Sequence, residues 1–261
     1  MLSCWHGGGQ SRSCWRKAMH RLGDAGYRAC TFDLRGHGQS EWSANGDYRI
    51  ERFVEDLVNV VETFSRPAVL IGASFGGHVS LLTAARHPAL VQALVLCDVT
   101  PWIEGEATRA MRQVMLSAAA GFGSVADAAR HLTLIGAIPV NLDCARLKRH
   151  LRVGRGGRFF WHWDPRFFSG QEDESAELTA QLVSAAQNVP APTLLIRAEC
   201  SEIVTQQQLR DFRAVVPHAG IAELSGARHT VTLDDNDGYA EIILGFLDRC
   251  ERNDSSTPTA E

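Results

Sequence analysis

Short apolar runs alternate with amphipathic stretches along most of the chain. Runs rich in β-branched residues, typical of buried strands, occupy residues 27–33, 68–72, 93–98, 193–198 and 221–224. Apolar residues at helical spacing lie between or after them, in residues 52–64, 75–87, 206–216 and 239–250. Strands that alternate with helices predict the α/β class, with a mostly parallel sheet covered by helices on both faces.

The alternation stops between residues 101 and 189. This segment is first Ala-rich and helical in places, then aromatic, and prolines stand at both of its ends. It predicts a helical cap, residues 101–189, inserted into a core made of residues 1–100 and 190–250. The last residues, 251–261, are polar and lack periodicity, which predicts a disordered tail.

One predicted strand ends at Gly72, which is the first residue of GASFG, a Gly-x-Ser-x-Gly pattern at residues 72–76. A serine on a sharp turn between strand and helix needs small neighbours, because side chains there would collide with backbone. Ser74 is therefore a candidate nucleophile, with free helix N–H groups next to its hydroxyl. The structural alternative is a close-packed turn without chemistry.

A serine hydroxyl needs a base to take its proton. His229 is the best placed of the ten histidines, because it lies in the loop between the last predicted strand and the final helix. Taken alone, a histidine in such a loop is usually a surface residue. Together with the Ser74 turn, its position favours the role of base.

The chain begins with a short apolar run followed by HGGG, residues 6–9. A glycine run after a strand lets backbone N–H groups face a developing oxyanion. We expect the N–H groups of Gly8 and Phe75 to be the donors, and His6 to brace the loop. The alternative is a flexible N-terminal loop.

HGGG, DLRGHGQS, GASFGG and GARH, in this order, resemble the α/β-hydrolase superfamily, in its serine hydrolase branch with an HGGG oxyanion loop and a nucleophile elbow. WHWDPRF in the cap and GARHTVTLDDND are similar to a bacterial group of these proteins. The resemblance runs from His6 to about Asp248. It implies a Ser–acid–His triad in that chain order, acyl-transfer chemistry, and neither a metal nor an organic cofactor.

The acid of this triad departs from the family pattern. Its common position follows the strand at 193–198, where this chain has Ser201, which cannot carry a negative charge. Glu202, one residue later, can, and so can Glu199. Some superfamily members use the end of the preceding strand, where this chain has Asp98. We favour Glu202 over Asp98 as the residue that orients His229.

The amino end also departs from the family, which carries two further strands before the HG loop. We expect these first two strands to be missing and the edge of residues 27–33 to be exposed. In the cap, Trp161, Trp163 and Phe167, with His162, are candidates to line an apolar acyl or ring pocket. Alternatively, they pack the cap against the core.

The net charge and the spacing of the cysteines indicate which classes of partner to expect. With a net charge of −4, the chain gives no electrostatic reason to expect nucleic acid or an anionic membrane. The seven cysteines are scattered without metal-ligand spacing, as expected for reduced thiols. We therefore predict a cytoplasmic protein with a small-molecule substrate and no metal. The sequence does not indicate an oligomeric state.

These features predict a cofactor-independent serine hydrolase that cleaves a small carboxylic ester or lactone through an acyl-enzyme. The same fold supports carbon–carbon bond hydrolysis, perhydrolysis and cofactor-free oxygenation. A binding protein with little catalysis, in which the cap encloses a small ligand, is the alternative from a different class.

Overall fold

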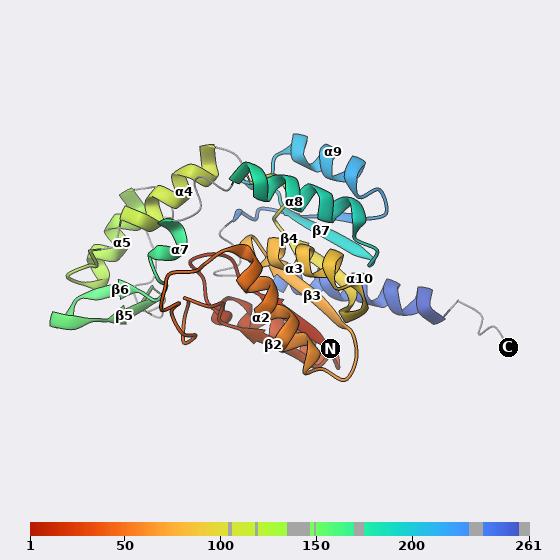
Figure 1. Ribbon diagram of the computed structural model, residues 1–261, viewed down its shortest axis with the longest axis horizontal. Coiled ribbons are helices and arrows are strands. Elements are labelled where there is room, and N and C mark those ends of the chain that lie inside the picture. The colour runs from red at the N-terminus through yellow and green to blue at the C-terminus, as the bar shows by residue number, and fades with distance from the viewer. Residues whose placement is uncertain are drawn as a thin grey trace.

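Figure 1 shows the computed structural model, in which a six-stranded sheet lies between layers of helices. The structure describes residues 1–103, 106–117, 120–134, 147–148, 150–169, 175–229 and 237–255. The strand order is β2-β1-β3-β4-β7-β8, and every neighbouring pair is parallel. The strands are β1 (Leu2–Trp5), β2 (Ala29–Phe32), β3 (Ala68–Ala73), β4 (Val91–Cys97), β7 (Thr193–Ala198) and β8 (Gly220–Leu224). The predicted α/β fold is confirmed.

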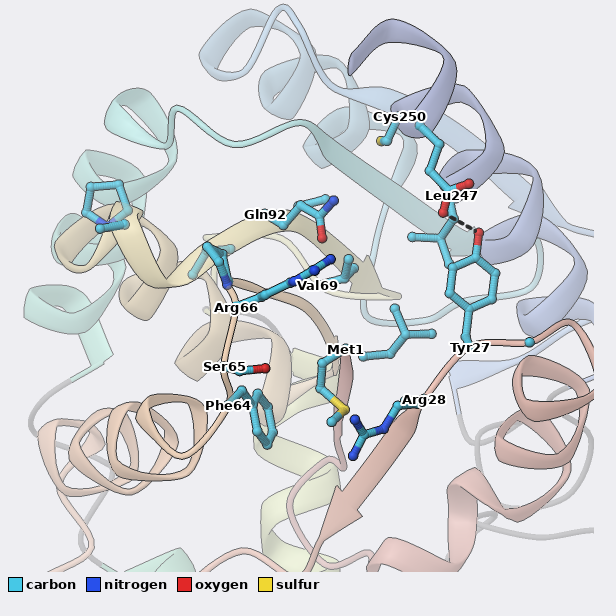
Figure 2. A pocket seen from close by; sticks show the side chains of 18 residues that line it. Met1, Tyr27, Arg28, Phe64, Ser65, Arg66, Val69, Gln92, Leu247 and Cys250 are labelled. Atoms are coloured by element: carbon cyan, nitrogen blue, oxygen red, sulfur yellow. Dashed lines mark hydrogen bonds between the residues drawn. The ribbon is translucent and has the colours of Figure 1, made fainter. Parts of the chain in front are cut away.

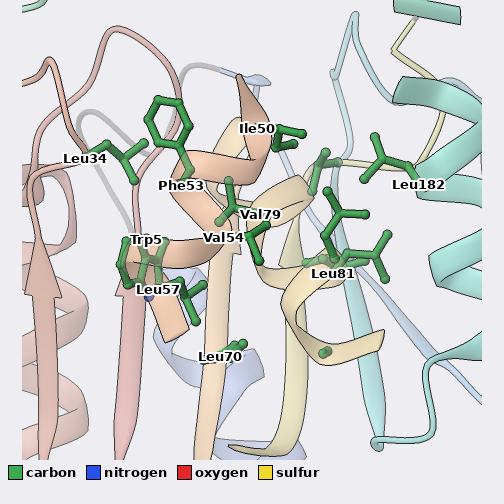
Figure 3. Packing of buried hydrophobic residues seen from close by; sticks show 14 of the residues in the cluster. Trp5, Leu34, Ile50, Phe53, Val54, Leu57, Leu70, Val79, Leu81 and Leu182 are labelled. Carbon is green, nitrogen blue, oxygen red and sulfur yellow. The ribbon is translucent and has the colours of Figure 1, made fainter. Parts of the chain in front are cut away.

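The sheet's two faces are separated by the alternation of side chains along each strand. On β3, Leu70 joins the cluster under one helical layer, whereas Ile71 joins the cluster under the other. Figure 3 shows the first cluster, in which Phe53, Leu57 and Leu81 pack over the sheet. The helices on that face are α2 (Ile50–Glu62), α3 (Phe75–Arg86), α8 (Ser175–Asn188) and α9 (Gln206–Val215); the opposite face carries α1 (Arg16–Asp24) and α10 (Asp237–Ser255).

Two helices, α1 and α10, differ from what the sequence predicted. Helix α1 is not among the elements predicted from the sequence, although its residues Ala18 and Leu22 lie at helical spacing and are fully buried. The tail was predicted to be disordered from residue 251, but α10 continues to Ser255, with exposed Glu251 and Arg252 on its last turns. The remaining tail residues lie outside the described part of the chain.

The segment between β4 and β7 projects from one end of the sheet (Figure 1). It contains a two-stranded antiparallel hairpin as well as helices, and the sequence-based expectation of a helical cap did not include these strands. Gly156 and Gly157, both with φ of 70°, make the turn between the two strands. The elements are α4 (Glu106–Ser117), α5 (Val125–Leu134), β5 (Leu151–Val153), β6 (Phe159–Trp161) and α7 (Arg166–Ser169), followed by α8, which packs on α3. Short 3₁₀ turns occupy Arg12–Trp15, Pro88–Leu90 and Arg155–Gly157.

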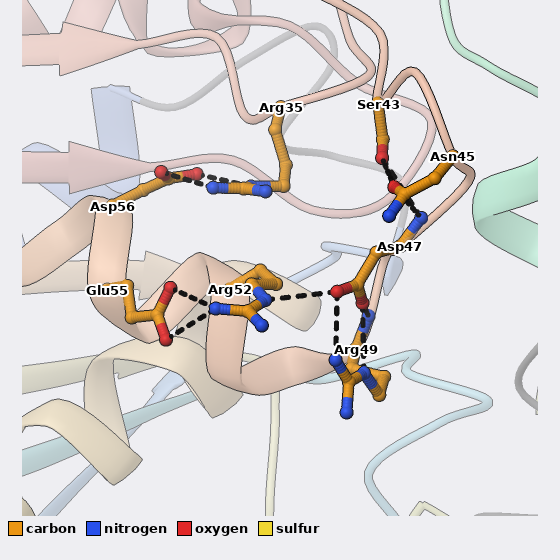
Figure 4. A network of polar contacts seen from close by, with 8 residues as sticks. All are labelled: Arg35, Ser43, Asn45, Asp47, Arg49, Arg52, Glu55 and Asp56. Atoms are coloured by element: carbon orange, nitrogen blue, oxygen red, sulfur yellow. Dashed lines mark hydrogen bonds and ion pairs between the residues drawn. The ribbon is translucent and has the colours of Figure 1, made fainter.

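Ion pairs fix the loop that leads into α2. Arg35 makes two hydrogen bonds of 2.6 Å to the carboxylate of Asp56 on this helix. Arg52 lies between Asp47 and Glu55 (Figure 4), with 3.0 Å from its Nε to Asp47 Oδ2. These contacts hold both ends of the connection between β2 and α2 against this helix.

A cavity of about 880 Å³ lies at the amino ends of the central strands (Figure 2). Met1, Arg28, Arg66 and Gln92 are among its lining residues. Parallel strands place all their carboxyl ends at the opposite edge of the sheet. This cavity is therefore remote from the loops in which the candidate catalytic residues lie.

Candidate active site

Ser74 stands alone between the end of β3 and the start of α3. Its φ of 48° and ψ of −122° are a strained conformation for a residue other than glycine. Glycine is required on both sides of it. A Cβ at Gly72 would lie 2.4 Å from the carbonyl oxygen of Gly76, and one at Gly76 would lie 2.5 Å from that of Trp5. The Gly-x-Ser-x-Gly pattern thus permits the close crossing that exposes the hydroxyl.

Ser74, His229 and Asp98 come from three different loops and form a chain of hydrogen bonds. His229 Nε2 lies 3.3 Å from Ser74 Oγ, and its Nδ1 lies 2.7 Å from Asp98 Oδ2. The Asp98 side chain is 1% exposed and that of His229 is 11% exposed. A buried carboxylate accepts the Nδ1 proton, which leaves the Nε2 lone pair directed at the serine hydroxyl.

Asp98 directly follows β4, and both oxygens of its carboxylate accept hydrogen bonds. Its Oδ1 accepts the N–H of Ala198 at 2.9 Å, and its Oδ2 accepts the hydroxyl of Ser201 at 2.7 Å as well as the imidazole N–H. Its φ of 49° bends the chain away from the strand. Because β3 and β4 are neighbours in the sheet, this bend places the carboxylate beside the Ser74 turn.

Glu202 does not reach His229, so the expectation that it partners the imidazole is wrong. Its Oε1 accepts a hydrogen bond of 2.7 Å from Arg228, and its side chain is 53% exposed. Glu199 also points elsewhere and accepts the N–H of Gly226. The physical reason lies in the loop after β7, where Ser201 turns inward onto Asp98 and its neighbour faces solvent. The useful sequence signal was an aspartate directly after the strand next to the serine strand.

The HGGG loop lies against the Ser74 turn. A Cβ at Gly7 would lie 3.0 Å from Ser74 Cβ. Gly7 N–H donates to Gln10 Oε1 at 2.9 Å and Gly9 N–H donates to His37 Nε2 at 3.0 Å. Within the described part of the chain, the N–H groups of Gly8 and Phe75 have no hydrogen-bond partner. Their assignment as oxyanion donors remains a prediction, and this geometry is compatible with it.

Three buried histidines hold the loops around this site. His6 Nε2 accepts the N–H of Leu34 at 2.9 Å, His37 Nε2 accepts that of Gly9, and His162 Nδ1 accepts that of Gly38 at 3.1 Å. Burial lowers the pKa of each of the three to about 3, so each is neutral and able to accept. The sequence predicted a bracing role for His6, which its hydrogen bond to the Leu34 N–H fits, but it did not indicate the acceptor role of His162.

The WHWDPRF segment attaches the cap to the loop after β2. Asp164 accepts the Tyr48 hydroxyl at 2.6 Å, and its own N–H donates to the Gly36 carbonyl at 2.7 Å. Phe167 packs edge-on against Phe75, with ring centroids 5.0 Å apart. A Cβ at Gly8 would lie 3.0 Å from the Phe167 ring. Phe167 therefore contacts both chain segments that carry the expected oxyanion donors.

Trp161 and Trp163 stack on each other in the same segment. Their ring centroids are 4.8 Å apart at an angle of 9°, and both side chains are buried. Trp163 also meets Phe168 edge-on. These contacts fit the packing alternative, and a role in lining the substrate pocket remains a prediction for all three aromatic residues. No helix in the described ranges is long and apolar enough to cross a bilayer.

Residues 2–235 match the family model described as "alpha/beta hydrolase fold". Two relatives match nearly the whole chain. The 2-(acetamidomethylene)succinate hydrolase of Mesorhizobium japonicum is 28% identical over 254 residues, which cover 95% of this chain and 88% of that protein. Esterase Rv0045c of Mycobacterium tuberculosis is 30% identical over 254 residues, with 93% and 81% covered.

Two solved structures match the fold of nearly the whole chain. The crystal structure of E-2-(acetamidomethylene)succinate hydrolase superposes with a TM-score of 0.81 at 24% identity, covering 95% of this chain and 91% of that one. A structure of the M. tuberculosis esterase Rv0045c gives a TM-score of 0.78 at 28% identity, with 95% and 84% covered. With the serine turn, the parallel sheet and these matches together, the chain belongs to the α/β-hydrolase family.

Proposed function

We propose that this protein is a serine hydrolase that cleaves a small carboxylic ester or lactone with Ser74 as nucleophile. The observation that carries the proposal is the hydrogen-bond chain from Ser74 Oγ through His229 to Asp98, with distances of 3.3 and 2.7 Å. The 30% identity to a protein named as an esterase supports the choice of an ester. No part of the proposed chemistry requires a group from outside the chain other than water.

In the first half-reaction, Ser74 Oγ forms a bond to the substrate carbonyl carbon while His229 Nε2 takes the hydroxyl proton. The carbonyl electron pair moves to oxygen and produces a tetrahedral oxyanion. As this intermediate collapses, the ester C–O bond breaks and His229 gives the proton to the leaving alkoxide. Asp98 stabilises the imidazolium that exists between these two transfers.

The N–H groups of Gly8 and Phe75 would stabilise the oxyanion. A donor of this kind contributes about 3–4 kcal/mol to transition-state stabilisation. In the second half-reaction, His229 removes a proton from water, the hydroxide attacks the acyl carbon, and Ser74 leaves with the proton. Trp161, Trp163 and Phe167 would form an apolar wall for the acyl or ring portion of the substrate.

The test is turnover of p-nitrophenyl acetate, p-nitrophenyl butyrate and a δ-lactone by the wild type and Ser74→Ala. We expect the substitution to remove esterase activity, and a fluorophosphonate probe to label only the wild type. Ser65→Ala, an exposed serine at the other end of the sheet, is the matched control and should retain the wild-type rate. Unchanged turnover by a folded Ser74→Ala protein would overturn the proposal.

A second candidate, cofactor-free oxygenation, is favoured by one observation: the Asp98–His229 pair is complete without the serine. Such a pair can remove a proton from a heteroaromatic substrate. Ser74→Ala together with His229→Ala separates the two functions, because oxygen consumption with a heteroaromatic panel would survive Ser74→Ala but not His229→Ala.

A further inference from the structure

Ser201 occupies the position where the family pattern places an acid, and its hydroxyl makes three hydrogen bonds. It donates to Asp98 Oδ2 at 2.7 Å, and it accepts the N–H groups of Ile203 at 3.2 Å and Val204 at 2.9 Å. The proton direction is unambiguous because a carboxylate only accepts and a backbone N–H only donates. The hydroxyl therefore links the loop after β7 to the carboxylate after β4.

The loop that carries Ser201 is itself fixed. Arg197, which is buried, donates from Nε to the Val204 carbonyl at 2.8 Å and from Nη1 to Glu223 at 2.6 Å. The N–H of Ser201 donates to the Ala198 carbonyl at 3.0 Å. Because hydrogen bonds fix both its backbone and its hydroxyl, Ser201 can determine the orientation of the Asp98 carboxylate.

We propose that Ser201 is a positioning residue that holds Asp98 Oδ2 in line with His229 Nδ1 and shares that oxygen with the imidazole. The proposal rests on the proposed function, because it assigns a role toward the same three residues. A hydrogen bond to the carboxylate withdraws electron density from it, so the serine also moderates how strongly Asp98 favours the imidazolium. Without the hydroxyl, Asp98 would rotate more freely and bind the protonated imidazole more strongly.

Three other titratable side chains in the described part of the chain interact with His229 or Asp98, and none of them is charged near neutral pH. His78 on α3 interacts with His229, and burial lowers the pKa of His78 to about 4. Cys97 on β4 and Tyr239 on α10 interact with each other and with Asp98, and burial raises the pKa of both. All three are neutral at pH 7, so a change in the pH–rate profile of a Ser201 variant would report on the Asp98–His229 pair.

The first experiment compares Ser201→Ala with Ser201→Thr, which keeps the hydroxyl. For Ser201→Ala we expect kcat for a p-nitrophenyl ester to fall about tenfold with KM changed less than twofold, and the acidic limb of the profile to move to higher pH. Ser201→Thr should stay within about threefold of the wild type. Glu202→Gln, the exposed neighbour, is the matched control. A wild-type kcat and profile in Ser201→Ala would overturn the proposal.

The second experiment repeats the substitution in an Asp98→Asn background and measures the second-order rate of fluorophosphonate labelling. If Ser201 acts through Asp98, its loss should change the labelling rate less than twofold there, against about tenfold in the wild type. Equal effects in both backgrounds would overturn the positioning role. If Ser201→Ala does not fold, Ser201→Cys, which is similar in size and a weaker donor, replaces it in both experiments.

The two proposals fail separately. Activity that survives Ser74→Ala refutes the serine hydrolase. Activity that is lost in Ser74→Ala but unchanged in Ser201→Ala refutes only the role of Ser201.

Discussion

The loops after β1 and β2 and the loop after β8 all bring histidines to the carboxyl end of the sheet, but they use them differently. His6 and His37 are fully buried, and each accepts a backbone N–H. His229 keeps 11% of its side chain exposed and lies between a carboxylate and a hydroxyl. The same side chain braces backbone in one region and is placed for proton transfer in the other.

The difference arises from the partners of the second ring nitrogen. The Nδ1 atoms of His6 and His37 meet the carbonyl oxygens of Gly7 and Arg35, which stabilise a neutral ring with a fixed tautomer. His229 Nδ1 meets the carboxylate of Asp98, which also stabilises the charged ring. A histidine becomes a candidate base when a carboxylate contacts one of its ring nitrogens and a hydroxyl with a transferable proton contacts the other.

The largest effect should come from removing that negative charge. Asp98→Asn keeps the shape of the side chain but cannot stabilise an imidazolium, so we expect kcat/KM for a p-nitrophenyl ester to fall about 10³- to 10⁴-fold. Glu202→Gln should leave kcat/KM unchanged, since its carboxylate bonds to Arg228. A large loss in Glu202→Gln together with a small one in Asp98→Asn would reverse the assignment.

An intermediate effect should come from the bracing region. His37→Leu removes the acceptor of the Gly9 N–H, so the glycine loop loses a buried hydrogen bond. We expect kcat to fall about tenfold and the free energy of unfolding to fall by about 1–3 kcal/mol, measured by ester turnover and urea denaturation. His37→Gln offers an acceptor and should recover part of both losses. Equal values for the two variants would show that the ring's packing matters, not its nitrogen.

The smallest effect per residue should be the contribution of each buried histidine to the pH dependence of the free energy of unfolding. The pKa of His6, His37 and His162 is about 3 in the folded protein, against an ordinary value of 6.5. Below pH 6.5 only the unfolded chain takes up these protons, so the free energy of unfolding should fall as pH drops. Each such histidine contributes about 1.4 kcal/mol per pH unit well below pH 6.5.

Urea denaturation at pH 7.5, 6.5 and 5.5 measures this dependence. We expect a loss of about 1 kcal/mol in total between the first two values, because the unfolded histidines are half-protonated at pH 6.5, and a loss of about 3 kcal/mol between the second and the third. His37→Gln should reduce the slope below pH 6.5 by about one proton. A stability that rises on acidification would contradict the neutral, buried state of these rings.

Local patterns predicted the core elements well because each depends on neighbours in sequence. Six apolar runs became the parallel sheet, and the glycines around Ser74 gave the turn its shape. The β5–β6 hairpin was missed because its strands are only three residues each. Such short strands carry too few residues for a two-residue period to be recognised.

The choice of carboxylate required contacts between distant segments. Asp98 and His229 are 131 residues apart in sequence, and Glu202 is much nearer to the histidine along the chain. Spacing favoured Glu202, but the adjacency of β3 and β4 and the inward turn of Ser201 determined the outcome. Side-chain direction in an irregular loop depends on the hydrogen bonds available around it, which one-dimensional spacing does not contain.

By itself, the sequence determined the α/β architecture, the strained serine turn and the loop that holds the histidine, because periodicity and glycine placement act over a few residues. Only the tertiary structure decided which carboxylate contacts His229 Nδ1. It alone also showed that His162 of the cap is a buried acceptor for the core loop. These outcomes depend on burial and on hydrogen bonds between loops that meet only when the sheet has formed.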